Sequence, residues 1–381
     1  MASPASGAGA APVVTAPGMS PSTAPLWAPG RITVASPSVV YSPNAITSTY
    51  TYNTTSVSLS PDGSAVASPS STTLEFTTLA SVPRTGVLVV GLGGNNGTTL
   101  AASLIAHRDR ITWATKKGRQ APTWYGSLTQ CATVRLGSCG GRDVHAPLSS
   151  LLPMLAPGDI VLGGWDISAL PMDAAMARAQ VLDGDLQRQV APAMAALGTP
   201  LRSFLYPTFV AANQDARADN LVPGDDKGAH LAGVRADIAA FKAAHNLDSV
   251  VVLWSANTER FSSVLPGVND TADALLASIA ASHTEVSPST VFAVASILEG
   301  CTYINGSPSN TFVPGVMELA AAKGVHIAGD DFKSGQTKMK SVLVDFLISA
   351  GIKPTSVVSY NHLGNNDGFN LVSGARGGGA R

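Results

Sequence analysis

A glycine-rich turn is the segment of this sequence whose residue types and spacing could bind a dinucleotide. Gly91-Leu-Gly-Gly-Asn-Asn-Gly97 follows the apolar run at residues 85–90 and precedes a stretch with helical spacing at residues 98–107. Glycines let the backbone approach a diphosphate, and a helix start offers free N–H groups and the positive end of its dipole. The spacing is G-x-G-x-x-x-G rather than the standard G-x-G-x-x-G, and a tight connection between two elements is the alternative interpretation.

An acidic residue that binds ribose hydroxyls is the second part of such a site. It normally lies about 20 residues after the turn, but between Leu100 and Arg135 the one acid is Asp109. Asp166 is the better candidate, because it follows the strand-like residues 159–164 and would lie at the carboxyl edge of a sheet. The local sequence fits a helix N-cap or turn aspartate equally well.

Residues 329–341 concentrate charge in a chain that has only 13% charged residues. The start of a predicted helix at Ser334, Gly335 and Gln336 could present N–H groups to a phosphate. Positive charge would come from three lysines, Lys333, Lys338 and Lys340. A solvated helix start with ordinary i,i+4 pairs is the alternative. The Asn-rich residues 360–367 follow closely in the sequence and could share a site with this segment.

The elements that would position these residues alternate along the chain. Short apolar runs at residues 85–90, 159–162, 249–253 and 291–295 read as strands, and a helix is predicted from about Met172. This alternation predicts an α/β fold with a doubly wound, Rossmann-like parallel sheet covered by helices on both faces. Before it, residues 31–83 form a predicted extended arm, because Thr, Ser, Val and Tyr are frequent there.

The composition excludes several classes of protein. With 24 Lys and Arg against 25 Asp and Glu, the formal charge of -1 offers no general field for nucleic acid or anionic lipid. Three cysteines without paired spacing argue against a disulfide framework or a metal site. No apolar run approaches the roughly 20 residues of a membrane helix. We therefore expect a soluble, cytoplasmic protein without nucleic-acid, membrane or metal partners.

The two ends of the chain have the composition of disordered segments. Residues 1–30 contain no charged side chain, which predicts a disordered leader. A transit peptide is the alternative, but such peptides are usually rich in arginine. Residues 372–381 consist mainly of Gly, Ala and Arg and predict a disordered tail.

Five segments, in the same order, together resemble the myo-inositol-1-phosphate synthase family, also called inositol-3-phosphate synthase. They are residues 91–97, Trp254-Ser-Ala-Asn-Thr-Glu-Arg-Phe261, Asn305-Gly-Ser-Pro-Ser-Asn-Thr-Phe312, residues 329–341 and Ser359-Tyr-Asn-His-Leu-Gly-Asn-Asn-Asp-Gly368. The resemblance extends from about Ile32 to about Leu371. It implies a Rossmann-like NAD-binding domain at residues 84–304, with an inserted α+β catalytic and tetramerisation domain that starts at residues 305–371 and is incomplete at the C-terminus.

The resemblance also implies an activity. The family converts D-glucose 6-phosphate to 1D-myo-inositol 3-phosphate in inositol and phospholipid biosynthesis, as a homotetramer with bound NAD. The implied steps are oxidation at C5, proton removal at C6, aldol attack on the C1 aldehyde and reduction of the ketone. These steps need a hydride acceptor, a base, and groups that stabilise enolate and alkoxide oxygens.

The resemblance also implies binding and catalytic roles for the residues that match the family's motifs. The expected NAD contacts are Gly93, Gly94, Asn95, Asn96, Asp166, Ser203, Phe204, Gln214, Arg217, Ala256, Asn257, Thr258, Gly306, Ser307, Asp331, Ser334, Asn365, Asn366 and Asp367. Asp331, Asn361 and Lys333 are the expected catalytic residues. Ser334, Gly335 and Gln336 are expected to bind the substrate phosphate, and no metal ligand is expected.

The resemblance stops after Leu371, where family members continue with a segment that supplies further active-site lysines. We therefore expect this chain alone to have little or no synthase activity, because positioned cations lower the activation barriers of such steps by several kcal/mol. The alternative function is a weakly active or inactive fragment that binds NAD or assembles with full-length subunits. An ordinary dehydrogenase that releases NADH is a third possibility.

Overall fold

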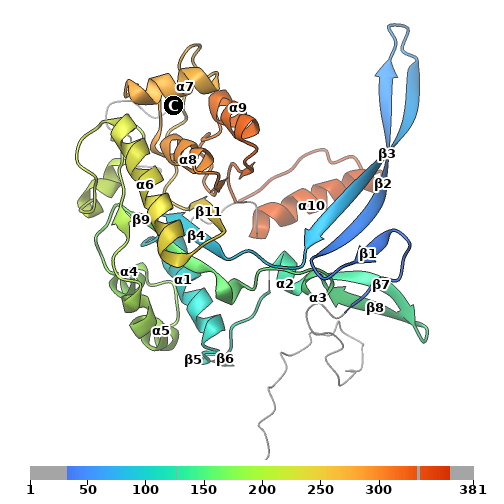
Figure 1. Cartoon of the computed structure of the whole chain (residues 1–381), viewed down its shortest axis with the longest axis horizontal. Helices are drawn as coiled ribbons and strands as arrows, with labels where there is room; N and C mark the ends of the chain where they lie inside the picture. Colours follow the sequence, from blue (N-terminus) through green and yellow to red (C-terminus); the bar gives the residue numbers. More distant parts are fainter. Residues whose placement is uncertain (1–31, 126, 333–334, 361–381) are drawn as a thin grey trace, which may run out of the picture. The chain divides into compact units, whose positions relative to one another are not determined.

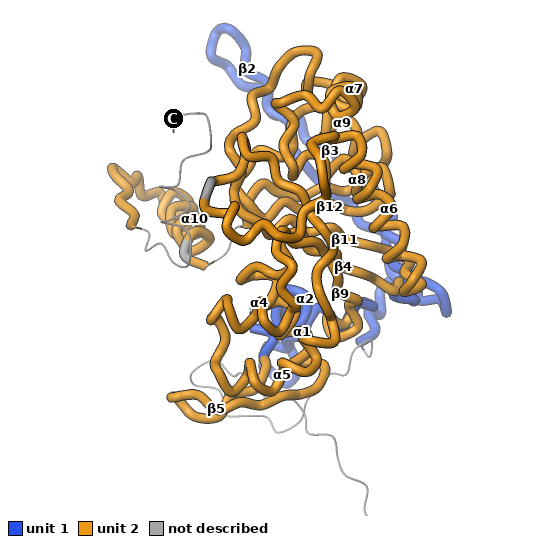
Figure 2. The backbone as a smooth tube through the Cα atoms, turned by 90° about the vertical axis from the view of Figure 1, so that its left-hand side faces the viewer, with its two compact units in different colours: residues 1–82, 123–155 blue, residues 83–122, 156–381 orange. Residues whose placement is uncertain are grey.

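The computed structural model describes residues 32–125, 127–332 and 335–360, and these form two compact units (Figure 1, Figure 2). The first unit contains the described residues up to 82 together with residues 123–155. The second contains residues 83–122 and the described residues from 156 onward. The expected nucleotide-binding segment at 84–304 is therefore interrupted by residues of the first unit, and its sheet continues beyond residue 304.

A sheet of six parallel strands forms the centre of the second unit. Its strands are β4 (Thr85–Val90), β9 (Val161–Asp166), β10 (Leu201–Arg202), β11 (Ser249–Trp254), β12 (Thr302–Asn305) and β13 (Ile327–Ala328). Their order across the sheet is β10-β9-β4-β11-β12-β13. The first strand of the chain thus lies in the middle, and the strand order reverses between β4 and β11, as in dinucleotide-binding folds. The predicted doubly wound parallel sheet is confirmed.

Helices cover both faces of this sheet (Figure 1). One face packs against α1 (Asn95–Arg108), α4 (Met172–Ala179) and α5 (Gly184–Ala196). The other packs against α6 (Lys227–His245), α7 (Ala272–Ala280), α8 (Pro288–Leu298) and α9 (Pro314–Lys323). Successive residues of β4 point to opposite faces of the sheet. Leu88 therefore packs in the core beside α6 to α9, and Val89 packs in the core beside α1, α4 and α5. Both side chains are fully buried, and each such burial stabilises the fold by about 1.5–3 kcal/mol.

The strand expected at residues 291–295 is wrong, because these residues lie within α8. Ser287 caps this helix by accepting a hydrogen bond from the Thr290 N–H, and Pro288 occupies its first turn. The helix is buried on every side, so its apolar residues do not show the amphipathic spacing of a surface helix. A short buried helix and a buried strand look alike in such a sequence.

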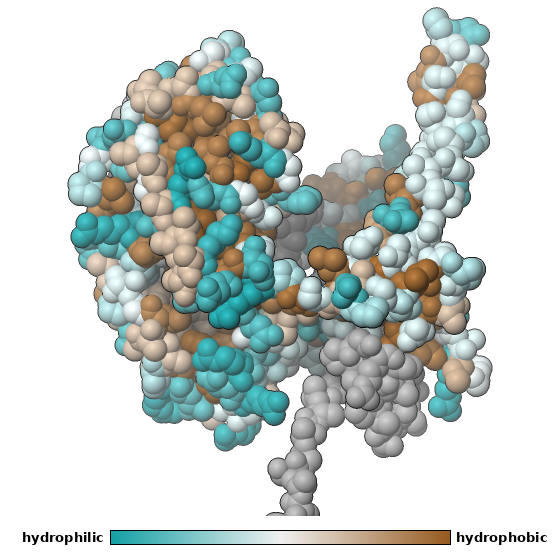
Figure 3. Space-filling model, viewed as in Figure 1, coloured by the Kyte–Doolittle hydropathy of each residue, from teal (hydrophilic) through white to brown (hydrophobic). Residues whose placement is uncertain are grey.

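The remaining elements are smaller. The first unit holds an antiparallel sheet of β1 (Val39–Tyr41), β2 (Ala45–Leu59) and β3 (Ala65–Leu79), a second hairpin of β7 (Thr133–Cys139) and β8 (Arg142–Pro147), and the short helices α2 (Leu128–Cys131) and α3 (Leu148–Leu151). The second unit also holds β5 (Trp113–Thr115), β6 (Gly118–Gln120), the 3₁₀ turns η1 (Pro157–Asp159) and η2 (Ala212–Arg217), and helix α10 (Gly335–Ser349). Val57, Leu59 and Val66 near the tip of the β2–β3 hairpin are exposed and form apolar patches there (Figure 3).

Two features are absent from the described residues. No helix among them is long and apolar enough to cross a bilayer. No group of three or more His, Cys, Asp or Glu side chains within these same ranges is arranged to hold a metal ion. The three cysteines, Cys131, Cys139 and Cys301, are free.

Candidate functional site

The candidate site lies where the strand order of the sheet reverses, at the carboxyl ends of β4 and β11. Gly91 follows β4 directly and has a φ of +88°, a backbone conformation that favours glycine. A Cβ atom at Gly91 would lie 3.0 Å from both the nitrogen and the Cα of Ala256, which follows β11. The two loops therefore touch through their backbones. In open α/β sheets, this reversal point is where ligands bind.

The glycine turn is closed by hydrogen bonds to two of its own carbonyl groups, those of Gly91 and Gly94. The Gly94 N–H donates to the Gly91 carbonyl at 3.0 Å, and the Thr98 N–H and hydroxyl donate to the Gly94 carbonyl at 3.0 and 2.8 Å. A Cβ atom at Gly97 would lie only 2.2 Å from the Leu92 oxygen, which explains why residue 97 is a glycine.

Helix α1 begins immediately after this turn, at Asn95. No side chain in the described part of the chain caps its N-terminus. The first N–H groups of a helix have no intrahelical acceptor, so those of Asn95 and Asn96 are available to a phosphate. The structure thus contains the strand, turn and helix that the sequence predicts for an anion site.

Asp166 is the last residue of β9, and its side chain is only 1% exposed. Its Oδ2 accepts a hydrogen bond from the Gly93 N–H at 2.9 Å. Its Oδ1 accepts from the Ser168 N–H and from Nη2 of Arg217, each at 2.9 Å. Asp166 therefore lies beside the glycine turn at the end of the second strand of the sheet. It also serves as a turn aspartate through Ser168, so both sequence interpretations describe part of its environment.

Arg178 is a neighbour of the turn that the sequence analysis missed. It lies in α4, and its Nη2 donates to the Gly93 carbonyl at 2.6 Å. Burial of the guanidinium and the nearby charge of Arg217 lower the pKa of Arg178 from its ordinary value, while Asp166 opposes this change. No local motif marks this residue, because 85 positions separate it from Gly93.

The loops after β11 and β12 are joined to each other. The Ser307 hydroxyl donates to the Ala256 carbonyl at 2.7 Å, and the Gly306 N–H donates to the Trp254 carbonyl at 2.9 Å. Three of the expected NAD contacts are thus held together at this edge of the sheet. Asn257 is half-buried and Thr258 is exposed in the same loop.

The segment after β13 also lies at this edge. Nδ2 of Asn305 donates to Oδ1 of Asp330 at 2.6 Å, and a Cβ atom at Gly306 would lie 2.2 Å from the Phe332 ring. Burial raises the pKa of Asp330, while its hydrogen bond from Asn305 lowers it. The expected active-site residue Asp331 is exposed and has a φ of +74°. The charged segment at 329–341 therefore begins beside the loop that carries Gly306 and Ser307.

Three further expected NAD contacts are buried. Ser203 is held by backbone hydrogen bonds with Asn220 and Val222. The Phe204 ring stacks on His230 and Phe292, with centroids 4.5 and 4.8 Å away, so its side chain belongs to the core. Gln214 lies in η2, and its Nε2 donates to Oδ1 of Asn213.

The remaining expected residues lie near residue 335 or after residue 360. Gly335 begins α10, and Gln336 is the second residue of this helix. Lys333, Ser334, Asn361, Asn365, Asn366 and Asp367 lie outside the described residues.

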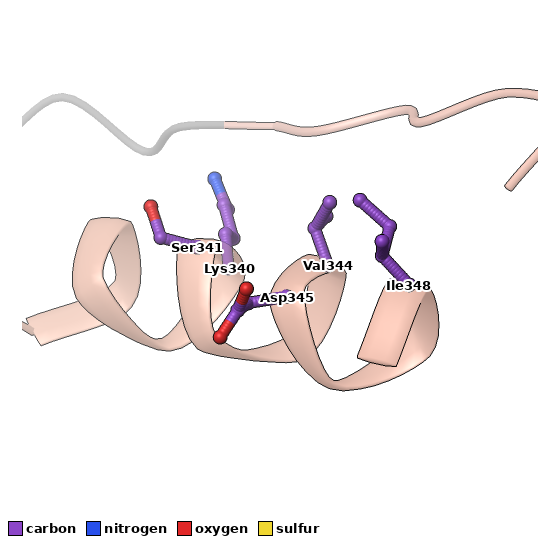
Figure 4. Close-up of a pocket in the computed structure, with 5 residues that line it drawn as sticks. All are labelled: Lys340, Ser341, Val344, Asp345 and Ile348. Atoms are coloured by element: carbon purple, nitrogen blue, oxygen red, sulfur yellow. The ribbon is translucent and has the colours of Figure 1, made fainter. Parts of the chain in front are cut away.

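Helix α10 carries a shallow pocket of its own. Lys340, Ser341, Val344, Asp345 and Ile348 line this pocket (Figure 4). Nζ of Lys340 donates to the Ser359 hydroxyl, and Lys338 is exposed. The pocket contains no residue of the glycine turn and no expected NAD contact, so we do not assign the cofactor to it.

Several buried polar atoms at the strand ends suit a polar ligand. Within the described chain, Nε of Arg217, Nε1 of Trp254, Oγ of Ser255 and Nδ2 of Asn213 have no hydrogen-bond partner. Buried polar groups are nearly always paired in folded proteins, with protein, water or ligand. Arg217, Trp254 and Ser255 adjoin Asp166 or the loop after β11. Together with the glycine turn and Asp166, these donors fit a dinucleotide such as NAD.

The sheet order and this site define a dinucleotide-binding protein of the doubly wound α/β class. An NAD-binding family model described as myo-inositol-1-phosphate synthase matches residues 85–363. The chain belongs to this family, as its sequence motifs predicted, and it carries the family's NAD-binding region.

Relatives and a solved structure agree with this membership. The chain is 56% identical over 339 residues to human inositol-3-phosphate synthase 1 and 57% identical over 339 residues to the bovine protein, in each case over 89% of the chain and 60% of the relative. It is 54% identical to the rice protein, covering 89% of the chain and 66% of that relative. The crystal structure of inositol-3-phosphate synthase from Caenorhabditis elegans matches with a TM-score of 0.86 at 48% identity, covering 91% of this chain and 68% of that one. The chain thus spans about 60% of the length of its mammalian relatives.

Proposed function

We propose that this chain acts as an inositol-3-phosphate synthase, an isomerase that converts D-glucose 6-phosphate to 1D-myo-inositol 3-phosphate. One observation carries the proposal: the glycine turn, Asp166 and the loop at 306–307 meet at one edge of a doubly wound sheet, where residues 329–332 also lie. The proposed cofactor site and the start of the proposed substrate-binding segment would therefore be adjacent. The names of the relatives support the assignment.

The residues of this chain would divide the work of binding. The N–H groups at the start of α1 would hold the diphosphate of the cofactor, since no side chain of the described residues caps them. Asp166 would accept from a ribose hydroxyl through a lone pair that its three internal donors leave free. NAD, when bound, would supply the hydride acceptor and donor.

The substrate would be held by the segment that follows β13. Ser334, Gly335 and Gln336 would bind its phosphate at the start of α10, with positive charge from Lys333. Asp331 and Asn361 would contact the reacting sugar. Lys333 would also stabilise negative charge on the enolate or alkoxide oxygen.

The setting of the enzyme follows the same assignment. We infer a homotetramer in the cytoplasm that serves inositol and phospholipid biosynthesis, without nucleic-acid or membrane partners. The near-zero net charge of the sequence supports the absence of nucleic-acid binding.

The test is incubation of the purified chain with glucose 6-phosphate and NAD, followed by phosphorus NMR of the products. The proposal predicts inositol 3-phosphate without net accumulation of NADH, in contrast to the little or no activity expected of this chain alone from its sequence. Net NADH with an oxidised sugar phosphate would instead indicate an ordinary dehydrogenase. Binding of NAD without any product would indicate a non-catalytic chain, and addition of this chain to an active full-length enzyme would then test mixed assembly.

A further inference from the structure

Arg178 holds the Gly93 carbonyl of the glycine turn through a side-chain hydrogen bond. The carbonyls of Gly91 and Gly94 accept from groups within the turn or the first turn of α1. The Gly93 carbonyl instead accepts a hydrogen bond from Nη2 of Arg178 at 2.6 Å. This arginine lies in α4, the helix that follows β9 in the sequence. A distant side chain therefore fixes the direction of this peptide group.

The direction of the Gly93 carbonyl matters for an anion. A carbonyl oxygen that faced a diphosphate would repel it, whereas an N–H group attracts it. Asp166 accepts from the Gly93 N–H, so both polar groups of this residue are held by side chains from separate elements. This double attachment leaves the following amides at the start of α1 to face a ligand.

The charges around the turn are also unbalanced. Arg217 lies close enough to Arg178 for its charge to lower the pKa of Arg178, and Asp166 is a carboxylate that interacts with both arginines. These three side chains therefore keep one net positive charge next to the glycine turn. Arg178 is exposed as a whole residue although its guanidinium is partly buried, and a guanidinium has five donors, of which one binds the Gly93 carbonyl.

We propose that Arg178 is a positioning residue of the dinucleotide site, which orients the Gly93 peptide and supplies positive charge to the diphosphate. This inference rests on the proposed NAD binding. It adds to the expected NAD contacts a residue from α4 that acts on the diphosphate and not on the adenosine.

Arg178→Met tests the proposal, because methionine has a similar reach but no charge and no donor. We expect NAD and ADP to bind about 10- to 100-fold more weakly, the usual effect of losing a hydrogen bond to a charged group. Adenosine, which has no diphosphate, should bind within about threefold of its wild-type affinity. Calorimetry gives the NAD and ADP affinities, and ligand-observed NMR gives that of adenosine.

Two matched variants accompany this measurement. Arg178→Lys keeps the charge but not the planar geometry of the guanidinium, so its NAD affinity should lie between those of the wild type and Arg178→Met. Arg188→Met removes an arginine of α5 whose side chain is 75% exposed, and it should leave NAD affinity unchanged.

Three results would overturn the proposal. Equal NAD affinity of the wild type and Arg178→Met would show that Arg178 has no role in binding, while the proposed function would stand. Equal weakening of adenosine and NAD would show a general structural effect instead. A wild-type chain that binds no NAD would overturn the proposed function and this inference together.

Discussion

The Gly93 N–H donates a hydrogen bond to Oδ2 of Asp166 at 2.9 Å, although 73 positions separate the two residues. This bond joins the turn after the first strand of the sheet to the end of the second strand. A Cβ atom at Gly93 would lie 3.2 Å from the same oxygen, so the turn leaves little room for a side chain. The contact thus couples the expected ribose-binding residue to the expected diphosphate-binding turn.

Asp166→Asn should weaken both the fold and the site. The asparagine keeps the shape but loses the charge that Arg217 and the Gly93 N–H share, so the free energy of unfolding should fall by about 1–3 kcal/mol. NAD affinity should fall about 10- to 100-fold for the same reason. Urea unfolding and calorimetry measure the two effects.

The control for this substitution is Asp109→Asn. Asp109 forms an exposed pair with Arg108 and is the acid nearest to the expected sequence spacing. Its loss should change stability by no more than about 0.5 kcal/mol and NAD affinity not at all. Equal effects of the two substitutions would remove Asp166 from the site.

Gly97→Ala should disrupt the turn by steric conflict. The added Cβ atom would lie 2.2 Å from the Leu92 oxygen and 2.6 Å from its carbonyl carbon, and both are backbone atoms that cannot move aside alone. We expect about 1–3 kcal/mol of destabilisation, as for other overpacked sites, and weaker NAD binding. Thermal unfolding with and without NAD measures both.

Gly233→Ala is the matched control in the interior of α6. No atom lies within 4 Å of a Cβ at Gly233, and alanine favours helix, so stability should rise by about 0.5–1 kcal/mol. A Gly97→Ala protein as stable as this control would contradict the geometry of the turn.

The pH dependence of stability should depend on Glu259, which follows the expected NAD contacts in the loop after β11. Its buried carboxylate accepts from the Ser289 N–H at 3.0 Å and from the Ser289 hydroxyl at 2.5 Å. Burial raises the pKa of Glu259 from 4.5 to about 7, while the hydrogen bonds from Ser289 and Ser287 and the charge of Lys227 lower it. The folded protein therefore holds a proton at pH values where the unfolded chain has released it.

This difference has a definite sign. Because the pKa is raised in the folded state, the contribution of Glu259 to stability is present below about pH 4.5 and is lost as the pH rises to about 7. The loss should reach up to about 3 kcal/mol. Urea unfolding of the wild type and of Glu259→Gln between pH 5 and 8 measures this loss. It is the change with pH in the difference between their free energies of unfolding. Parallel pH profiles for the two proteins would contradict the buried, proton-holding carboxyl.

The sequence predicted the part of the fold that has local signals. The apolar runs of β4 and β11 and the helix after the glycine turn all have the expected type. The apolar run at 159–162 overlaps β9, which begins at Val161. Strands β10 and β13 have two residues each, too few for a hydrophobic pattern. The misassigned residues 291–295 had no polar face by which a helix could be recognised.

Site residues that belong to a sequence motif could be predicted. Residues that come together only through the packing of distant elements could not. Asp166 could be found because an acid at the end of a strand has a meaning in this class of fold. Its spacing from the turn is unusual because β5–β8 and α2–α3 lie between β4 and β9 in the sequence. Arg178 and the Asn305–Asp330 contact depend on the packing of α4 and on the loops at the sheet edge, which no local pattern specifies.

A crystal structure of this chain grown with NAD tests the central claim most directly. The account predicts the diphosphate of NAD at the start of α1, with its oxygens about 3 Å from the N–H groups of residues 95–97, and the adenosine ribose beside Asp166. NAD bound at another edge of the sheet, or on α10, with no contact to the glycine turn, would contradict it.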